Sequence, residues 1–345
     1  MKPRIAILAS LSASGEQGGA ERLYTGLRDA LSRAGVAVHL LEIYNDERDF
    51  ERIKRSYLRF YDLKLDGYDG IISAKAPSFV ARHKNHVCYL MHTMRVFYDM
   101  FESTFPHPTR ENFEQRRLVH ALDTAALQRP RRLFAVGHEV ADRLSRFNGL
   151  AAEVMRHPSS MEGLHKGNFE YFLLPGRLHR WKRAQLGIEA MRFVTEPIEL
   201  IVAGSGEDEA EFRRLAAGDL RVRFVGRVSD VQLAELYANA LAVLFTPKSE
   251  DLGLITLEAF RSAKPVITCG DSGEPARIVS DGISGYVCRP DAAHIGASME
   301  HLAHNRVRAR EMGRAGQSAI AAITWERVAK TLITALGVSE TVAAQ

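Results

Sequence analysis

Two glutamates stand eight residues apart in the stretch SEDLGLITLEAFRSAKPVI, residues 249–267. Glu250 precedes an apolar, glycine-containing run that is typical of a helix start, and Glu258 falls one to two turns inside that helix. The start of a helix favours a negatively charged ligand because its N–H groups and its dipole face outward. The stretch therefore indicates a site where acids and a helix N-terminus meet an anionic ligand.

Two cations belong to another candidate site segment, GRLHRWK, residues 176–182. Arg177 and Lys182 leave a predicted strand there, and together they suit a diphosphate, Arg by bidentate bonding and Lys as a point charge. Taken singly, such residues in a loop are usually just solvated. Glycine-rich loops at 15–21 and 203–207 also follow predicted strands, where the backbone can approach an anion closely.

The sequence predicts short apolar strands that alternate with helices, and these elements position the loops. Such an alternation is typical of doubly wound parallel sheets. The predicted strands cover residues 4–10, 36–43, 68–74, 86–92, 132–137, 170–177, 198–206, 222–228, 241–247, 264–270 and 285–290. Ligands of such sheets bind at the carboxyl ends of the strands.

The pattern restarts after a break near residues 158–170, which predicts two Rossmann-like lobes. We expect the first lobe to span residues 1–165 and the second to span 166–323. The last amphipathic helix, within 324–345, is expected either to stay beside the second lobe or to cross back to the first.

The cysteine spacing, the apolar runs and the net charge of the chain limit its cellular location and its binding partners. The three cysteines are scattered without a CxxC pair, which favours a reducing compartment and argues against a cysteine-built zinc site. No window approaches a membrane span and the first apolar run is short for a signal peptide, so we expect a cytoplasmic protein. The net charge of +4 is too mild to indicate nucleic acid, although it could suit an anionic membrane surface.

Four segments of the chain carry a resemblance to a known family: FLLPGRLHRWKR, LIVAGSGEDEAEFRRLA, VRFVGRVSDVQLAELYANA and the run from Phe245 to Pro290. In their order and spacing they resemble the retaining glycosyltransferases of family 4. The resemblance implies an α/β protein with the GT-B fold, two Rossmann-like doubly wound parallel-sheet lobes facing across a cleft. It is strongest over residues 170–290, where Glu250 and Glu258 fit the family's E-x7-E motif.

The resemblance implies a role for each candidate residue. Glu250 would face the donor sugar, and Glu258 would hold the ribose hydroxyls of the nucleotide. Arg177 and Lys182 would neutralise the donor diphosphate. The rest of the implied donor site consists of Gly18, Gly19, Val228, Gly253 and Leu254.

A looser match lies at CYLMHTMRVFYD, residues 88–99, which resembles an H-x-P-x-R-x-x-(W/Y)-D stretch of some members. Met94 replaces the proline. A lone histidine is more often structural, but in this context His92 is implied to face the donor sugar and to take part in catalysis.

The function implied is a retaining hexosyltransferase that moves a sugar from a nucleoside-diphosphate-sugar donor, of the UDP-sugar or GDP-mannose type. The acceptor would be a hydroxyl of a glycan, a lipid-linked molecule or a small molecule. We expect no metal and no other cofactor, because Arg177, Lys182 and the helix start can stabilise the leaving diphosphate. Glu250 is expected to position the sugar rather than to act as nucleophile.

The sequence leaves other functions open. A non-catalytic sugar-nucleotide-binding partner subunit would keep the fold, and a GT-B-fold epimerase is a second alternative. A phosphorylase would need a pyridoxal-phosphate lysine that the sequence does not reveal. A nicotinamide dehydrogenase is disfavoured because no GxGxxG fingerprint is present.

Residues 48–64, RDFERIKRSYLRFYDLK, place aromatic and aliphatic side chains at helical spacing among many basic ones. Such a helix could lie on the inner face of a membrane that carries a lipid-linked acceptor. More often its apolar face packs on its own core, and both interpretations stay open from the sequence.

Overall fold

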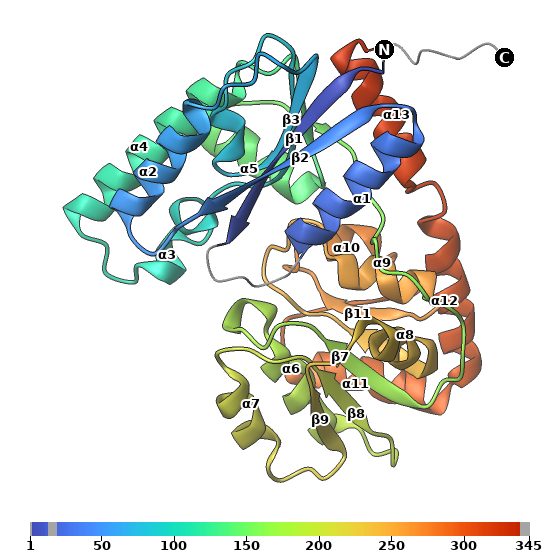
Figure 1. Cartoon of the computed structure of the whole chain (residues 1–345). Helices are drawn as coiled ribbons and strands as arrows, with labels where there is room; N and C mark the ends of the chain where they lie inside the picture. Colours follow the sequence, from blue (N-terminus) through green and yellow to red (C-terminus); the bar gives the residue numbers. More distant parts are fainter. Residues whose placement is uncertain (1, 13–18, 339–345) are drawn as a thin grey trace, which may run out of the picture. The chain divides into compact units, whose positions relative to one another are not determined.

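This computed structural model describes residues 2–12 and 19–338 of the chain. The chain divides into two compact units (Figure 1), of which the first combines Met1–Ser160 with Ile323–Gln345 and the second is Met161–Ala322. The units thus divide a few residues before the boundary at 165 that the sequence suggested. Two separate α/β units of this kind confirm the predicted fold class.

The first unit is built on a six-stranded parallel sheet in the order β2-β1-β3-β4-β5-β6. Its inner strands are apolar on both faces because helices cover both sides, as in β1, where Ile5 to Ala9 are all buried. Its elements are β1 (Arg4–Ser12), α1 (Gly19–Arg33), β2 (Ala37–Asn45), α2 (Phe50–Tyr61), β3 (Gly70–Lys75), η1 (Ser78–Val80), β4 (His86–His92), η2 (Arg95–Phe97), α3 (Phe101–Thr104), α4 (Arg110–Leu127), β5 (Arg132–Ala135), α5 (His138–Asn148), β6 (Glu153–Val154) and α13 (Trp325–Leu336).

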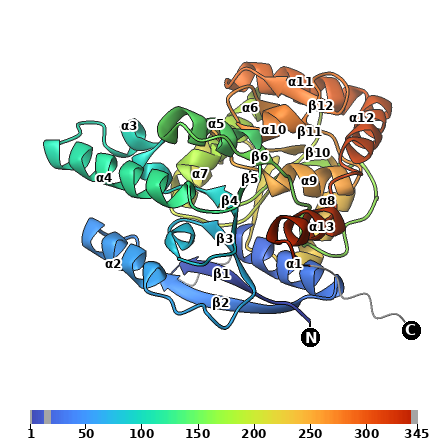
Figure 2. The same cartoon turned by 90° about the horizontal axis from the view of Figure 1, so that it is seen from above.

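Helix α13 joins the first unit although it comes last in the sequence. It lies beside α1 on one face of the sheet, and α2 and α4 cover the other face (Figure 2). The contact between α1 and α13 is close because Gly26 has no side chain there, which lets the Trp325 ring approach the backbone of α1. The same ring stacks on buried His157, with ring centroids 5.1 Å apart.

The basic segment 48–64 turns its apolar side inward. Ile53, Tyr57 and Phe60 of α2 are buried in the first unit, and the Tyr57 hydroxyl donates a 2.7 Å hydrogen bond to the buried carboxylate of Asp123 on α4. The apolar stripe that a membrane-surface helix would need is therefore used by the core. Among the described helices, none combines the length and the apolar composition of a bilayer crossing.

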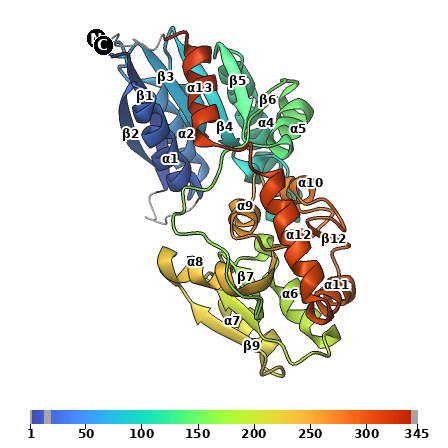
Figure 3. The ribbon, with the colours of Figure 1, turned by 90° about the vertical axis from the view of Figure 1, so that its right-hand side faces the viewer.

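The second unit has a six-stranded parallel sheet in the order β12-β11-β10-β7-β8-β9, seen from another side in Figure 3. This is the strand order of a dinucleotide-binding Rossmann sheet. All strands are parallel, and the order in which the chain adds them to the sheet reverses between β7 and β10. Its elements are β7 (Tyr171–Pro175), η3 (Arg180–Lys182), α6 (Ala184–Ala190), η4 (Met191–Phe193), β8 (Leu200–Ala203), α7 (Glu209–Ala216), β9 (Val222–Gly226), α8 (Asp230–Asn239), β10 (Ala240–Leu244), α9 (Leu254–Arg261), β11 (Val266–Cys269), α10 (Glu274–Ile278), β12 (Gly285–Cys288), α11 (Ala292–His304) and α12 (Arg306–Ala319).

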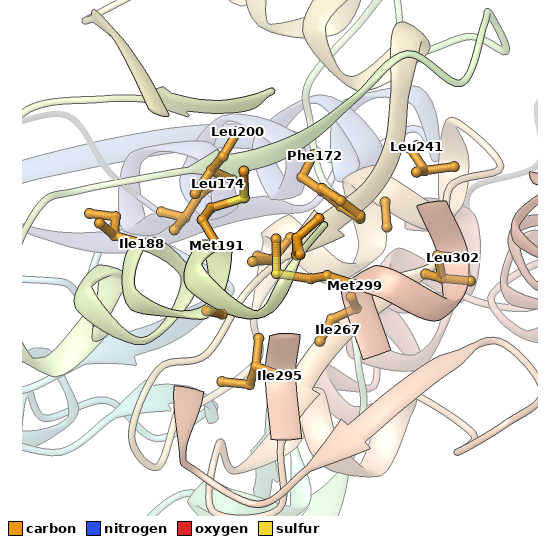
Figure 4. Packing of buried hydrophobic residues seen from close by; sticks show 14 of the residues in the cluster. Phe172, Leu174, Ile188, Met191, Leu200, Leu241, Ile267, Ile295, Met299 and Leu302 are labelled. Carbon is orange, nitrogen blue, oxygen red and sulfur yellow. The ribbon is translucent and has the colours of Figure 1, made fainter. Parts of the chain in front are cut away.

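A continuous apolar core holds the second sheet to the helices on one of its faces (Figure 4). Phe172 and Leu200 from the strands interdigitate with Met191, Ile295 and Met299 from the neighbouring helical segments, all of them buried. Burying a side chain of this size contributes about 1.5 to 3 kcal/mol. This core fixes β7 and β10 side by side, and the loops that follow them are positioned by it.

The contact between Gly26 and Trp325 gives a stability test. A Cβ added at Gly26 would lie 2.2 Å from the Trp325 ring, so Gly26→Ala should push α13 away and lower the free energy of unfolding by about 1 to 3 kcal/mol. Gly67→Ala is the matched control, because nothing lies within 4 Å of a Cβ there. Chemical denaturation followed by tryptophan fluorescence measures both, and equal stabilities would contradict the packing described.

Candidate functional site

The loops after β7 and β10 bring a lysine and a glutamate together at the point where the strand order reverses. Lys182 Nζ lies 2.6 Å from Glu250 Oε2, although the two residues are far apart in the sequence. Both side chains are partly open to solvent, at 33% and 20%. The ammonium also stands 5.6 Å from the centre of the buried Phe245 ring. The structure thus brings into contact two residues that the sequence analysis assigned to one site.

Arg183 locks these two loops to the loop after β11. Its guanidinium donates to both carboxylate oxygens of Asp271, at 2.7 and 2.6 Å, and to the carbonyl oxygens of Thr246 and Pro247, at 2.8 and 2.7 Å. Such a bidentate fork fixes orientation as well as distance. Sequence reasoning missed Arg183 and Asp271, because neither fits a motif and their pairing joins distant loops.

The backbone is strained at two residues of these hydrogen-bonded loops. Arg183 and Ser249 both adopt left-handed backbone angles, with φ of 52° and 49°, which cost non-glycine residues of order 1 to 3 kcal/mol each. Arg183 directly follows Lys182, and Ser249 directly precedes Glu250. The surrounding hydrogen bonds therefore hold the loops at Lys182 and Glu250 in a conformation that the isolated loops would not favour.

Glu250 is fixed through its own backbone as well. Its N–H donates to the Ser272 carbonyl at 3.0 Å, and its carbonyl accepts from Glu274 N at 2.9 Å. Gly273 between them has a φ of 74°, and a Cβ there would lie 2.6 Å from the backbone nitrogen and oxygen of Glu250. Only glycine fits this approach. The sequence shows a glycine at 273 but gives no sign of which residue it faces.

Helix α9 starts after Gly253, in agreement with the predicted helix start. Gly253 has a φ of 78°, and no side chain caps the helix. A Cβ at this position would lie 2.6 Å from Pro275, so a larger residue would push apart the segments that flank Glu250. Leu254 is the first helical residue and is half-buried. The N-terminal end of α9 is thus placed within the loop region that carries Glu250.

Glu258, the second acid of the pair, lies deeper in α9. It is only 4% exposed, and one carboxylate oxygen accepts a 2.8 Å hydrogen bond from the Tyr237 hydroxyl on α8. A buried carboxylate needs such a donor to offset its lost hydration. The two acids therefore have different surroundings, Glu250 beside a cation and Glu258 beside a phenol.

Arg177 shares the loop after β7 with Lys182 but has another partner. It forms an ion pair with Glu207, whose Oε2 lies 3.3 Å from Arg177 Nε. The pKa of Glu207 is lowered, first by a hydrogen bond to its own backbone N–H and then by Arg177. The glycine-rich loop 203–207 thus contributes an acid that the sequence analysis did not single out. Val228 is half-buried in the loop after the edge strand β9.

The remaining predicted residues belong to the first unit. His92 is the last residue of β4, and its Nδ1 donates to the carbonyl oxygen of Thr93 at 2.8 Å. Because a carbonyl only accepts, Nδ1 carries the proton in this arrangement. Gly19 is the first residue of α1, and Gly18 lies outside the described residues.

The rest of the His92 motif is anchored by half-buried charges that pair with buried ones. Arg95 pairs with Asp99 at 2.6 Å, and Asp99 also pairs with Arg143, which is 2% exposed, at 2.9 Å. Tyr98 donates to Asp123 at 2.8 Å. Burial raises the pKa of Asp123 to about 7, and the two tyrosine hydroxyls that donate to it lower that pKa only in part.

Possible metal ligands are sparse in the part of the chain that the structure describes. No group of three or more His, Cys, Asp or Glu side chains there is arranged to hold a metal ion. The candidate site of the second unit instead combines ammonium and guanidinium groups with carboxylates. Such a set can bind phosphate oxygens through its cations and sugar hydroxyls through its acids.

A comparison with known families gives a match in the second half of the chain. Residues 156–319 match the family described as glycosyl transferases group 1. Relatives include the alpha-1,3/1,6-mannosyltransferase ALG2 of Mus musculus, 28% identical over 45% of this chain and 42% of that protein. The O-antigen chain mannosyltransferase C of Escherichia coli is 30% identical over 39% of this chain and 37% of that protein. The chain thus matches less than half the length of these relatives.

Solved structures resemble the chain over nearly its whole length. Sucrose-phosphate synthase from Thermosynechococcus elongatus has a TM-score of 0.77 and 17% identity, covering 96% of this chain and 98% of that one. HepE of Anabaena, in complex with UDP and glucose, has a TM-score of 0.72 and 16% identity, covering 97% and 99%. At these identities the likeness shows the fold. The family match over residues 156–319 supports the resemblance to glycosyltransferases, and the structural likeness shows that the chain has the GT-B fold.

Proposed function

We propose that this protein is a retaining glycosyltransferase that transfers a hexose from a nucleoside-diphosphate-sugar donor to a hydroxyl acceptor. The observation that carries the proposal is the contact between Lys182 and Glu250 at the switch point of the second sheet. A switch point is where doubly wound sheets bind nucleotides. A cation for a diphosphate and an acid for sugar hydroxyls stand together there.

The transfer breaks the bond between the anomeric carbon and the diphosphate, and charge builds on the departing oxygens. Lys182, with Arg177 on the same loop and the start of α9, offsets that charge electrostatically. The acceptor oxygen bonds to the anomeric carbon on the face that the diphosphate leaves, and its proton passes to the departing phosphate. Glu250 orients the sugar in this scheme, and His92 is proposed to face the sugar from the first unit.

The identity of the sugar and of the acceptor is a finer part of the proposal. The names of two of the relatives, from Mus musculus and Escherichia coli, state mannosyltransferase activity, which favours a GDP-mannose donor, while the UDP and glucose bound in HepE favour a UDP-sugar. The acceptor is proposed to be a glycan, a lipid-linked or a small-molecule hydroxyl. If the acceptor is held in a membrane, contact must involve surfaces other than the buried stripe of α2.

The first test compares Lys182→Ala with Lys166→Ala. Removing the Lys182 ammonium should lower turnover by roughly 10²-fold or more, as the loss of an oxyanion donor does. Lys166 is exposed in the same unit and serves as the matched control with unchanged turnover. Release of nucleoside diphosphate from GDP-mannose and from UDP-glucose is the measurement. Unchanged turnover in Lys182→Ala would remove that residue from the site, whereas no release from any donor by the parent protein would favour a non-catalytic role.

The second test separates the two acids. Glu258→Gln should weaken nucleoside diphosphate binding by about 1.5 to 3 kcal/mol, the value of a hydrogen bond to a charged group. Glu250→Gln should leave that binding nearly intact and lower turnover steeply, because its carboxylate serves the sugar. Calorimetry with the nucleoside diphosphate, together with steady-state kinetics, measures both.

Tyr237→Phe controls for the burial of Glu258. It removes the hydroxyl that donates to Glu258 but keeps the carboxylate, so it should lower stability more than nucleotide affinity. Equal losses of nucleotide affinity in the two glutamate variants would mean that the roles are divided wrongly.

The third test concerns metal. We propose that transfer needs no divalent cation, since Arg177 and Lys182 supply positive charge beside the diphosphate. Activity should then persist in excess EDTA, within about twofold of the untreated enzyme. Complete loss with chelator, restored by magnesium or manganese, is the result that would refute metal independence.

A further inference from the structure

The first unit contains a hollow of about 620 Å³ at the amino ends of β3 and β4, within the usual size range of ligand pockets. His86, the first residue of β4, lines it, whereas His92 ends the same strand. Six residues of strand separate the two by about 20 Å. The hollow is therefore a different place from the candidate site. The side chains that line it and bear on its chemistry are those of Asp66, Arg82, His83, Lys84, His86 and Arg129.

Three cations face this hollow without a carboxylate partner among the described residues. Arg82 stacks on the Tyr61 ring, 4.1 Å from its centre, which orients the guanidinium and leaves its N–H edge for other acceptors. Arg129 uses one N–H donor on the carbonyl oxygen of Val80, at 2.9 Å. Arg95 and Arg143 of the same unit, by contrast, both pair with the carboxylate of Asp99.

His86 adds a rigid wall to the hollow rather than a charge. His86 is 3% exposed, and its Nε2 bonds with Ser73 Oγ at 2.8 Å. The pKa of His86 is lowered to about 3, first by burial and then by the charges of Arg129 and His83. His83 bridges the carbonyl of Tyr68 and the backbone of Asn85. A positive field at a fixed wall is what a bound anion would complement.

We propose that this hollow binds a phosphate monoester. Two guanidinium groups and one ammonium match the geometry and charge of a phosphate, since Arg bonds it bidentately and Lys neutralises it. Asp66 is the only carboxylate among the residues that line the hollow. It repels the phosphate and can accept hydrogen bonds from hydroxyls, which favours an ester of a polyol over inorganic phosphate. The proposal is independent of the proposed glycosyl transfer.

The test uses glycerol 3-phosphate and inorganic phosphate as probes, with calorimetry on the full chain. Lys84→Glu combined with Arg129→Glu should weaken binding of glycerol 3-phosphate at least tenfold and leave nucleoside diphosphate binding unchanged. Arg110→Glu combined with Arg117→Glu, an equal charge change on the exposed surface of α4, is the matched control. Asp66→Asn should tighten binding of inorganic phosphate several-fold and reduce the preference for the ester. A gain of affinity cannot result from damage to the fold.

Vesicles distinguish a soluble ester from a lipid headgroup. Sedimentation with phosphatidylcholine vesicles, with and without phosphatidic acid, is measured on the same variants. Binding of the soluble ester that depends on Lys84 and Arg129 supports a free ligand. Binding only to phosphatidic acid vesicles, lost in the double variant, supports a lipid phosphate. If the parent protein binds neither probe, or binds both as tightly after charge reversal, the proposal is wrong.

Discussion

The ion pair between Arg183 and Asp271 is the constraint on which the candidate site depends. It ties together the loops after β7, β10 and β11, and its guanidinium also holds the carbonyls of Thr246 and Pro247. Arg183 is only 14% exposed, so water competes weakly for its hydrogen bonds. These bonds offset the strained backbone at Arg183 and Ser249. This fork, together with the backbone hydrogen bonds of Glu250 to Ser272 and Glu274, holds the adjacent residues Lys182 and Glu250 near each other.

The strands could be predicted from the sequence because a parallel sheet covered on both faces leaves short apolar runs between helices. The structure confirms the α/β class, and most predicted strands differ from the observed ones by a few residues at their ends, where apolar character fades. Strand β6, with only two residues, was missed because so short an element leaves no periodicity. Residues 48–64 show the limit of such patterns. An apolar stripe on a basic helix looks alike whether it faces a membrane or a core, and only the partners of Tyr57 and Phe60 decide.

The candidate site was predictable in its residue types rather than in its contacts. The resemblance named Lys182 and Glu250, and the structure brings these two side chains into contact. It did not indicate Arg183, because positive charge in a loop is common and its partner lies 88 positions further on. Nor could it indicate Gly273, whose role depends on the close approach of the Glu250 backbone. Contacts between residues of separate loops depend on which strands are neighbours in the sheet. Local sequence patterns do not indicate the order of the strands.

Charge balance explains why the site holds acids and cations in pairs. Lys182 faces Glu250, Arg183 faces Asp271 and Arg177 faces Glu207, so these six side chains sum to no net charge. In the proposed function a donor brings an anionic diphosphate into this neutral set, and its oxygens must replace a carboxylate as partner of a cation. Arg183 is held by two further carbonyls and is a poor candidate for exchange. Lys182, a flexible point charge with one acid partner, can turn to the phosphate. Glu250 is then released toward hydroxyls of the sugar, while Glu258, held by Tyr237 in the interior, keeps its place throughout.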